Sequence, residues 1–407
     1  MAQERVRLDA EHHLVTACHP VACEHRTVEE HVLGPGRGER AEIVLSERQR
    51  RDPSQGVHVE RDRHAQHTLA PERGARRRQH PVLVGARPRV IGTRRLPDPV
   101  QERAAELFDV ELNTGDDPLP AARLADAMRS ADGVLVTVTD RVDSAVLGVE
   151  ARRARIVANF GVGHDHIDLE AAGRHGIAVT NTPGVLTDDT ADLAMALLLA
   201  VLRRVGEGER HLRSGRWTGW RPTHMLGIRA TGATLGIVGM GRIGRAVAAR
   251  AHHGFGMQVR YFQPRPIDPA TLAGLPAVPC ASVEELLATC EVISLHCPST
   301  PQTRNLIDAD RLALMRPGSV LINTARGDLV DEVALAHALV AGPLAGAGLD
   351  VYAQEPRVPA ALMELENVVL LPHLGSATVQ ARRAMGDRAI DNLAAFFAGH
   401  EAPDRLV

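Results

Sequence analysis

The chain has 407 residues, of which 44% are hydrophobic and 24% charged, as expected for a globular protein with more than one domain. Its net charge of −3 gives no overall attraction to nucleic acid or anionic membranes, and its longest apolar run (193–202) is too short to span a bilayer. All 47 basic residues are arginine, so chemistry that needs a lysine, such as a Schiff base or a P-loop, is excluded.

Residues 1–84 differ in composition from the rest. They hold nine of the twenty histidines and many arginines, without a sustained helical or strand period. We expect a disordered extension or a start codon assigned too far upstream. Metal binding by the segment CHPVACEH (18–25) and nucleic-acid binding by the arginines are the weaker alternatives, because the cysteine and histidine spacing is not that of a zinc site.

The start of the chain has no apolar core typical of a secretory signal. The five cysteines show no disulfide spacing pattern, and they are Cys18, Cys23, Cys280, Cys290 and Cys297. Both features favour a reducing cytoplasm.

From residue 87 onward, predicted strands alternate with predicted helices. The first series comprises strands at 87–96, 131–140, 154–163 and 177–183, with helices at 97–108 and 167–176. An apolar helix at 188–205 follows, with acids in its first turn and arginines in its last, and should be buried. The second series has strands at 234–239, 258–263, 291–297, 319–325, 345–351 and 367–373, with helices at 331–342 and 376–399. Such alternation predicts an α/β fold with parallel sheets covered on both faces.

The segment TLGIVGMGRIG (234–244) carries the pattern Gly-x-Gly-x-x-Gly between a buried strand and a helix. In that context the glycines allow a tight turn, close approach of a pyrophosphate and close packing of helix on strand. The helix N-terminus adds free N–H groups for the phosphates. We expect a dinucleotide to bind at Gly239, Gly241, Arg242, Ile243 and Gly244.

The next strand ends in Gln263, where an NAD-binding protein has an acid, and Arg265 follows. An acid would repel a 2′-phosphate and an arginine would pair with it. The sequence therefore favours NADP(H), with NAD(H) as the alternative, and a solvated Arg265 is the competing interpretation.

Three ionisable residues lie at or just beyond the carboxyl ends of predicted strands: Arg326, Glu355 and His373. Ligands of open α/β sheets bind at that edge. A histidine can protonate the oxygen of a carbonyl that receives a hydride, and a carboxylate beside it stabilises the imidazolium. An arginine can hold a substrate carboxylate with two hydrogen bonds. Together they predict a reductase of 2-oxo acids, or a 2-hydroxy acid dehydrogenase in reverse, with no need for a metal.

Six segments in order make residues 87–407 resemble the D-isomer-specific 2-hydroxyacid dehydrogenase family, closest to its glyoxylate/hydroxypyruvate reductase branch. They begin at Asn159, Gly232, Leu295, Leu321, Gly346 and Pro372, and include NFGVGHDHIDLEAAG, LINTARGDLVDE and PHLGSAT. The segment GRWTGWRPTHMLG (215–227), which holds both tryptophans, is similar to that branch, although the tryptophans could instead pack a linker helix. Pro264 and Pro266 depart from the branch and leave the cofactor preference open.

The resemblance implies two doubly wound, Rossmann-like domains with a cleft between them, and a homodimer. Residues 85–183 and 374–407 would form the substrate domain, and 184–373 the dinucleotide-binding domain. Arg326 would bind the substrate carboxylate with backbone groups of Val162 and Gly163, and His373 would be the acid–base with Glu355 as its partner. The residues expected to line the cofactor are Thr190, Cys297, Thr324, Asp350 and Gly375.

The resemblance leaves three functions open. The leading one is reduction of glyoxylate, hydroxypyruvate or a similar small 2-oxo acid. Oxidation of 3-phosphoglycerate or phosphite is a related alternative, and a nucleotide-sensing, corepressor-like binding protein is an alternative of another class. No partnership with nucleic acid or membrane is expected.

Overall fold

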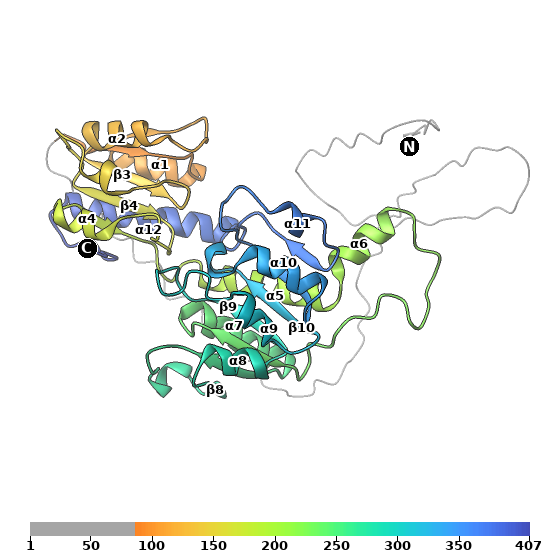
Figure 1. The fold of residues 1–407 in the computed structure, drawn as a ribbon. Coiled ribbons are helices and arrows are strands. Elements are labelled where there is room, and N and C mark those ends of the chain that lie inside the picture. The colour runs from red at the N-terminus through yellow and green to blue at the C-terminus, as the bar shows by residue number, and fades with distance from the viewer. Residues whose placement is uncertain (1–85) are drawn as a thin grey trace, which may run out of the picture. The chain divides into compact units, whose positions relative to one another are not determined.

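The computed structural model describes residues 86–407, which all belong to one compact unit. The predictions for residues 1–84 lie outside the described residues. The described chain forms a five-stranded and a seven-stranded sheet, and all strand pairs in both are parallel. Figure 1 shows each sheet with its helices. The predicted fold of two parallel-sheet α/β domains is confirmed.

The first sheet has the strand order β2-β1-β3-β4-β5. Its strands are β1 (Arg89–Gly92), β2 (Asp109–Leu112), β3 (Gly133–Thr137), β4 (Ile156–Phe160) and β5 (Ala178–Thr180). On one face lies α1 (Asp98–Leu107), and on the other lie α2 (Ala121–Ser130), α3 (Ser144–Leu147) and α4 (Leu169–Arg174). Strand β4 is buried at every position because helices cover both faces. The edge strand β2 was not predicted, since its four residues alternate between acidic and apolar.

The second sheet has the strand order β12-β11-β10-β9-β6-β7-β8. Its strands are β6 (Thr234–Val238), β7 (Gln258–Phe262), β8 (Ala277–Pro279), β9 (Val292–Leu295), β10 (Ser319–Asn323), β11 (Leu344–Leu349) and β12 (Val368–Leu370). One face packs on α5 (Thr187–Leu202) and α7 (Arg242–Phe255), and the other on α8 (Val283–Thr289), α9 (Ala309–Ala313), α10 (Glu332–Val340) and α11 (Ala360–Met363). Two short 3₁₀ turns cover Pro269–Leu272 and Gly327–Leu329.

In the second sheet, the order in which successive strands are added reverses beside β6. The chain builds β6, β7 and β8 toward one edge, and then places β9 on the other side of β6. Ligands of open α/β sheets bind beyond the carboxyl ends of the strands at such a reversal. The turns after β6 and β9 touch there, because a Cβ added to Gly239 would lie 2.6 Å from the backbone nitrogen of Cys297.

Helix α5 is buried as predicted, and it packs on β10, β11, β12 and α7. The prediction that arginines occupy its last turn is wrong, because the helix ends at Leu202 and has no basic residue in that turn. Arg204 instead takes a left-handed conformation, with φ of 53°. Its guanidinium pairs with Glu207 Oε1 at 2.6 Å at the start of a separate helix, α6 (Val205–Arg213).

Helix α12 (Val379–Phe397) brings the end of the chain back to the first sheet, where it packs on β4 and α1. The packing is close, since a Cβ added to Gly386 would lie 2.5 Å from Val100 Cγ1. Arg103 of α1 also pairs with Asp387 at 3.1 Å and with Asp391 at 2.6 Å. The domain boundaries near residues 183 and 373 stay a prediction. Among the described helices, none is both long and apolar enough to cross a membrane.

Candidate active site

A cavity of about 1430 Å³ lies among the loops that follow the strands of both sheets. Its lining includes Phe160 and Val162 from the first sheet, Gly241 and Arg326 from the second, and Met385 from α12. A pocket for one small ligand typically measures about 300–1,000 Å³. The larger volume gives room for an extended cofactor together with a small substrate.

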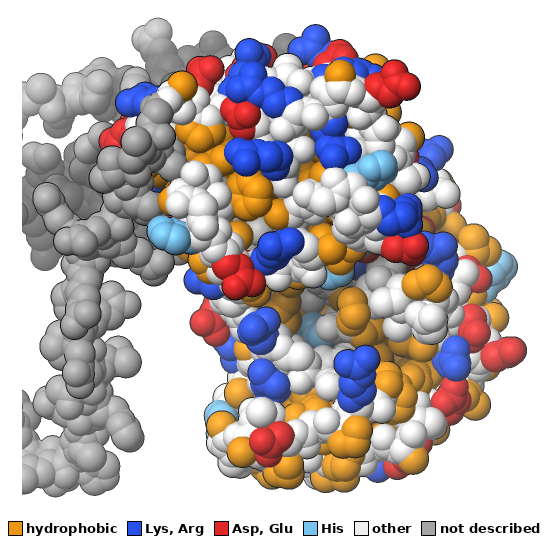
Figure 2. Space-filling model, turned by 90° about the vertical axis from the view of Figure 1, so that its left-hand side faces the viewer, with side chains coloured by type: hydrophobic (Ala, Val, Ile, Leu, Met, Phe, Trp, Pro, Cys, Tyr) orange, Lys and Arg blue, Asp and Glu red, His pale blue; other side chains and the backbone are white. Residues whose placement is uncertain are grey.

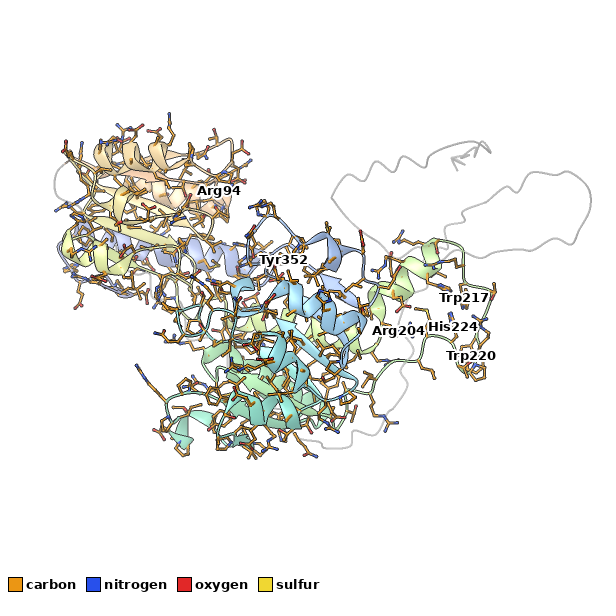
Figure 3. All side chains as sticks on the ribbon, viewed as in Figure 1. Arg94, Arg204, Trp217, Trp220, His224 and Tyr352 are labelled. Atoms are coloured by element: carbon orange, nitrogen blue, oxygen red, sulfur yellow. The ribbon has the colours of Figure 1, made fainter. Side chains whose placement is uncertain are left out.

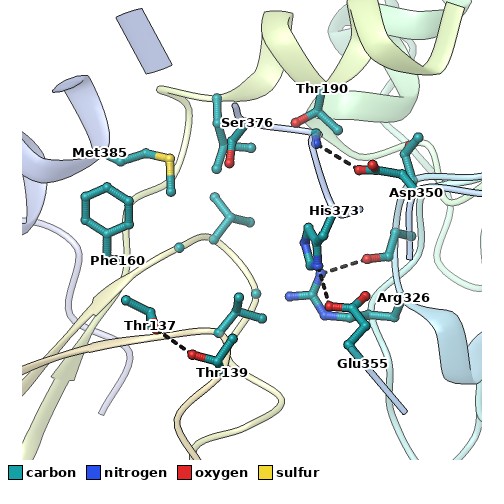
Figure 4. Close-up of a pocket in the computed structure, with 18 of the residues that line it drawn as sticks. Thr137, Thr139, Phe160, Thr190, Arg326, Asp350, Glu355, His373, Ser376 and Met385 are labelled. Atoms are coloured by element: carbon teal, nitrogen blue, oxygen red, sulfur yellow. Dashed lines mark hydrogen bonds and ion pairs between the residues drawn. The ribbon is translucent and has the colours of Figure 1, made fainter. Parts of the chain in front are cut away.

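His373 and Glu355 meet at this cavity, as the sequence predicted. His373 Nδ1 lies 2.8 Å from Glu355 Oε2, and each side chain is 30% exposed. Figure 4 shows both side chains beside Arg326, with Phe160 and Met385 across the cavity. With Nδ1 engaged by the carboxylate, Nε2 is the ring nitrogen left to exchange a proton with a ligand.

The backbone fixes both members of this pair. The N–H of His373 donates to the carbonyl of Asp350 at 2.8 Å, and His373 takes a left-handed conformation with φ of 55°. Glu355 Oε1 accepts the N–H of Tyr352 at 3.1 Å. Burial alone would raise the pKa of Glu355, but hydrogen bonds from His373 and Tyr352 and the charges of His373 and Arg326 outweigh it and hold the pKa below its usual range. Glu355 is therefore a carboxylate near neutral pH.

Arg326 follows β10 on a turn held by the buried Asn323. The Asn323 side chain donates to the carbonyl of Arg326 at 2.8 Å and accepts the N–H of Ala325 at 3.0 Å. The next residue must be glycine, since a Cβ on Gly327 would lie 1.9 Å from the carbonyl carbon of Tyr352. These contacts aim the guanidinium into the cavity beside His373 (Figure 4).

The loop after β4 presents backbone donors to the same place. The side chain of Asn159 donates to the carbonyls of Gly161 at 3.1 Å and Gly163 at 2.8 Å, and Asn181 donates to the carbonyl of Val162 at 2.8 Å. These bonds hold the carbonyls of the loop. Among residues 86–407, the N–H groups of Val162 and Gly163 have no hydrogen-bond partner. Such unpaired, neighbouring N–H groups form an anion-binding concavity.

The glycine loop has the geometry of a phosphate cradle. Gly239 has φ of 92°, and a Cβ on Gly244 would lie 2.3 Å from the carbonyl oxygen of Gly239, so both positions require glycine. A Cβ on Gly241 would meet no atom within 4 Å, which leaves space for a ligand against the backbone. Helix α7 starts here without a side-chain cap, so its first N–H groups are free. Gly241, Arg242 and Ile243 line the cavity.

All five residues expected to line the cofactor also lie at this cavity: Thr190, Cys297, Thr324, Asp350 and Gly375. The buried hydroxyl of Thr324 has no partner among the described residues, so a ligand group could satisfy it. Burial raises the pKa of Cys297 to about 11, which keeps it a thiol. These residues fit a bound dinucleotide.

The carboxylate of Asp350, which is expected to contact the cofactor, also holds the backbone that follows His373. Its carboxylate oxygens accept the N–H groups of Leu374 at 2.6 Å and Gly375 at 2.8 Å. Burial raises the pKa of this carboxyl, and the two N–H donors reduce the effect. Asp350 therefore caps the backbone after His373, and each of its carboxylate oxygens keeps a second lone pair for a ligand.

Gln263 and Arg265 do not line the cavity. They follow β7, and the carbonyl of Phe262 accepts the N–H of Gly239 at 3.0 Å, so this strand end adjoins the glycine loop. Arg265 is exposed. No group of His, Cys, Asp and Glu side chains within residues 86–407 could hold a metal ion.

Sequence reasoning did not single out Asp165, which lies 2.8 Å from Arg326 Nε. The one available signal was an acid just beyond the end of a buried strand, two residues after Gly163. It also missed the role of Asn159, because a buried asparagine within an apolar run gives no sign of which carbonyls it holds.

Known proteins resemble this chain in both sequence and structure. Residues 195–375 match the family described as D-isomer specific 2-hydroxyacid dehydrogenase, NAD binding domain. The chain is 45% identical over 325 residues to the glyoxylate reductase of Thermococcus litoralis, covering 79% of this chain and 97% of that protein. It is 44% identical over 324 residues to the glyoxylate reductase of Korarchaeum cryptofilum, covering 79% and 96%.

Among solved structures, the TT0316 protein of Thermus thermophilus superposes with a TM-score of 0.73 at 47% identity, covering 78% of this chain and all of the other. The NADPH-dependent glyoxylate/hydroxypyruvate reductase of Sinorhizobium meliloti, in complex with NADP and malonate, superposes with a TM-score of 0.70 at 38% identity, covering 79% and 97%.

Proposed function

The chain belongs to the D-isomer-specific 2-hydroxyacid dehydrogenase family, and we propose that it reduces glyoxylate, hydroxypyruvate or a similar small 2-oxo acid. It is an oxidoreductase that transfers a hydride between a nicotinamide cofactor and a 2-oxo or 2-hydroxy acid. The observation that carries the proposal is the convergence of the His373–Glu355 pair, Arg326 and an open glycine cradle on one cavity.

A reduced nicotinamide, when bound, supplies the hydride. Arg326 and the N–H groups of Val162 and Gly163 hold the substrate carboxylate and so orient its carbonyl. His373 Nε2 gives its proton to the carbonyl oxygen as negative charge develops there, and takes a proton back in the reverse direction. Glu355 keeps the imidazole in orientation through Nδ1, at 2.8 Å, and stabilises its charged form.

NADP(H) is the proposed cofactor in preference to NAD(H). Gln263 removes the negative charge that would repel a 2′-phosphate, and Arg265 is an exposed cation at the same strand end. The similar Sinorhizobium meliloti enzyme binds NADP in its structure. Initial rates with NADPH and NADH at equal concentration test this preference.

A homodimer is proposed from the segment after α6. Trp217 is 51% and Trp220 82% exposed, Leu226 is exposed on the same segment, and Leu212 is exposed in the last turn of α6. Figure 3 shows both tryptophans on a loop that extends beyond the sheets. Exposed apolar side chains of this size favour a protein partner, and a second copy is the simplest one. Sedimentation equilibrium measures the assembly, and a monomer at micromolar concentration would contradict it.

A cytoplasmic location is proposed because Cys280, Cys290 and Cys297 are free thiols, as is typical of reducing compartments. On the face shown in Figure 2, arginine side chains are dispersed among acidic and apolar ones. This pattern supports a small-molecule substrate over a nucleic-acid partner.

The proposed reaction is tested with a panel of substrates on the full chain. Glyoxylate, hydroxypyruvate, pyruvate and 3-phosphohydroxypyruvate are assayed as oxidants of NADPH and of NADH, and phosphite is assayed with NADP⁺ and NAD⁺. We expect turnover of the small unphosphorylated 2-oxo acids. Tight nucleotide binding without turnover of any of them would instead favour a nucleotide-sensing protein.

A further inference from the structure

The guanidinium of Arg326 is held from two sides. Its Nε–H donates to Asp165 Oδ1 at 2.8 Å, and Nη1 donates to the carbonyl of Ala325 at 2.7 Å. Arg326 follows β10 of the second sheet, whereas Asp165 lies on the loop after β4 of the first. The contact thus joins the two halves of the substrate-carboxylate site, which come from different sheets.

The loop that carries Asp165 is itself firmly supported. The side chain of Asn159 fixes its carbonyls, as described above, and His166 Nε2 lies 3.2 Å from Asn159 Oδ1. Burial lowers the pKa of His166 to about 4, so this neighbour is neutral at physiological pH. Arg326 is therefore the cation that Asp165 faces, and the side chains of this pair are only 22% and 33% exposed.

Nη1 uses one of its two hydrogens for the carbonyl of Ala325, so its second hydrogen and both hydrogens of Nη2 remain for a ligand. With Nε engaged by Asp165, a carboxylate cannot use the Nε–Nη2 edge of the guanidinium, so two parallel hydrogen bonds require the Nη1–Nη2 edge. Nη2 lies directly against the loop backbone, since a Cβ on Gly163 would be 1.5 Å from it. Nη2 of that edge therefore adjoins Gly163, on the loop that carries the unpaired N–H groups of Val162 and Gly163.

We propose that Asp165 is a positioning residue for the substrate carboxylate: by holding Nε of Arg326, it turns the Nη1–Nη2 edge toward the loop N–H groups so that both sets of donors bind one carboxylate. The inference rests on the proposed function, because it concerns how a 2-oxo acid is held. The competing role is purely structural, in which Asp165 ties the two sheets together without orienting the guanidinium.

The test compares Asp165→Ala and Asp165→Asn with a matched control, Asp192→Ala. Asp192 pairs with Arg250 Nε at 2.6 Å, does not line the cavity and has 69% of its side chain exposed. For each full-length variant, KM and kcat for glyoxylate, the Kd of NADPH and the melting temperature are measured. We expect Asp165→Ala to raise KM on the order of 10-fold, equivalent to about 1.4 kcal/mol, with kcat and the Kd of NADPH within twofold of wild type.

The asparagine variant separates the two roles. The amide oxygen of Asn can still accept the Nε–H, so Asp165→Asn should return KM to within about threefold of wild type. Asp192→Ala should leave KM unchanged. An unchanged KM in Asp165→Ala, or a loss shared by NADPH affinity and melting temperature that Asn does not rescue, would overturn the positioning role.

A double-mutant cycle tests whether Asp165 acts through Arg326. In an Arg326→Ala background, Asp165→Ala should cause no further loss of kcat/KM, and an undiminished 10-fold loss would refute the inference. If the wild-type chain turns over no 2-oxo acid, the proposed function fails by itself. The Kd of oxamate, an isostere with the same carboxylate, then replaces KM in the comparison, and no oxamate binding to wild type would overturn the inference too.

Discussion

Replacing Gly163 by alanine should disable substrate binding while leaving the fold intact. The added Cβ would lie 1.5 Å from Arg326 Nη2 and 2.6 Å from Cζ. Ordinary contact begins near 3.4 Å, so the guanidinium must move by about 2 Å. Gly163 does not have a positive φ, so alanine fits the backbone, and the atoms it meets belong mainly to a flexible side chain. The substitution therefore displaces Arg326 rather than the loop.

The size of the effect follows from the contacts that this displacement breaks. The bond from Arg326 Nε to Asp165, at 2.8 Å, cannot survive a 2 Å shift. A charge-assisted hydrogen bond contributes about 1.5–3 kcal/mol, and displacing a substrate-positioning group by about 1 Å can reduce the rate about 10²-fold. We expect kcat/KM for glyoxylate to fall on the order of 10²-fold. Replacing glycine by alanine restricts the unfolded chain and so stabilises the fold by about 0.4–1 kcal/mol. This gain should partly offset the stability lost with the Arg326–Asp165 pair.

The assay pairs steady-state kinetics with NADPH binding and thermal melting. Gly254→Ala in α7 is the control, because its Cβ would meet no atom within 4 Å, its φ is not positive and it does not line the cavity. We expect this control to keep wild-type kinetics. A folded Gly163→Ala protein with unchanged NADPH affinity and kcat/KM within threefold of wild type would refute the placement of Arg326 at the substrate carboxylate.

Three further outcomes are expected. His373→Ala should lower kcat by about 10²–10⁴-fold without changing the Kd of NADPH, and surviving activity would mean that another group donates the proton. Gln263→Asp should shift the ratio of kcat/KM values toward NADH, and an unchanged ratio would locate the discriminating contact elsewhere. Glu355 has a lowered pKa in the folded chain, so its stabilisation is present above its unfolded pKa of about 4.3 and is lost as pH falls through the folded value. The melting-temperature difference between wild type and Glu355→Gln should therefore be largest near pH 7 and shrink below about pH 4, and a difference independent of pH would exclude an ionic contribution.

Much of the fold follows from local patterns. Runs such as those of β4 and β10 are mostly apolar at consecutive positions, so they predict strands buried on both faces, and the structure has them in parallel sheets. Elements with weak patterns were missed or misjudged. Strand β2 alternates polar and apolar residues over only four positions, and α5 ends before its arginines because Arg204 turns the chain into α6.

The sequence by itself determined the chemical groups and the ends of the strands that carry them. Arg326, Glu355 and His373 each follow a strand, and parallel topology brings such ends to one edge. Only the tertiary structure decided how these groups are aimed. The 2.8 Å contact of Arg326 with Asp165 joins residues 161 positions apart, and the loop carbonyls are turned inward by Asn159. The Arg326–Asp165 contact requires loops from both sheets to meet, which no local period or spacing in the chain encodes, and an asparagine within an apolar run does not reveal which carbonyls it will hold.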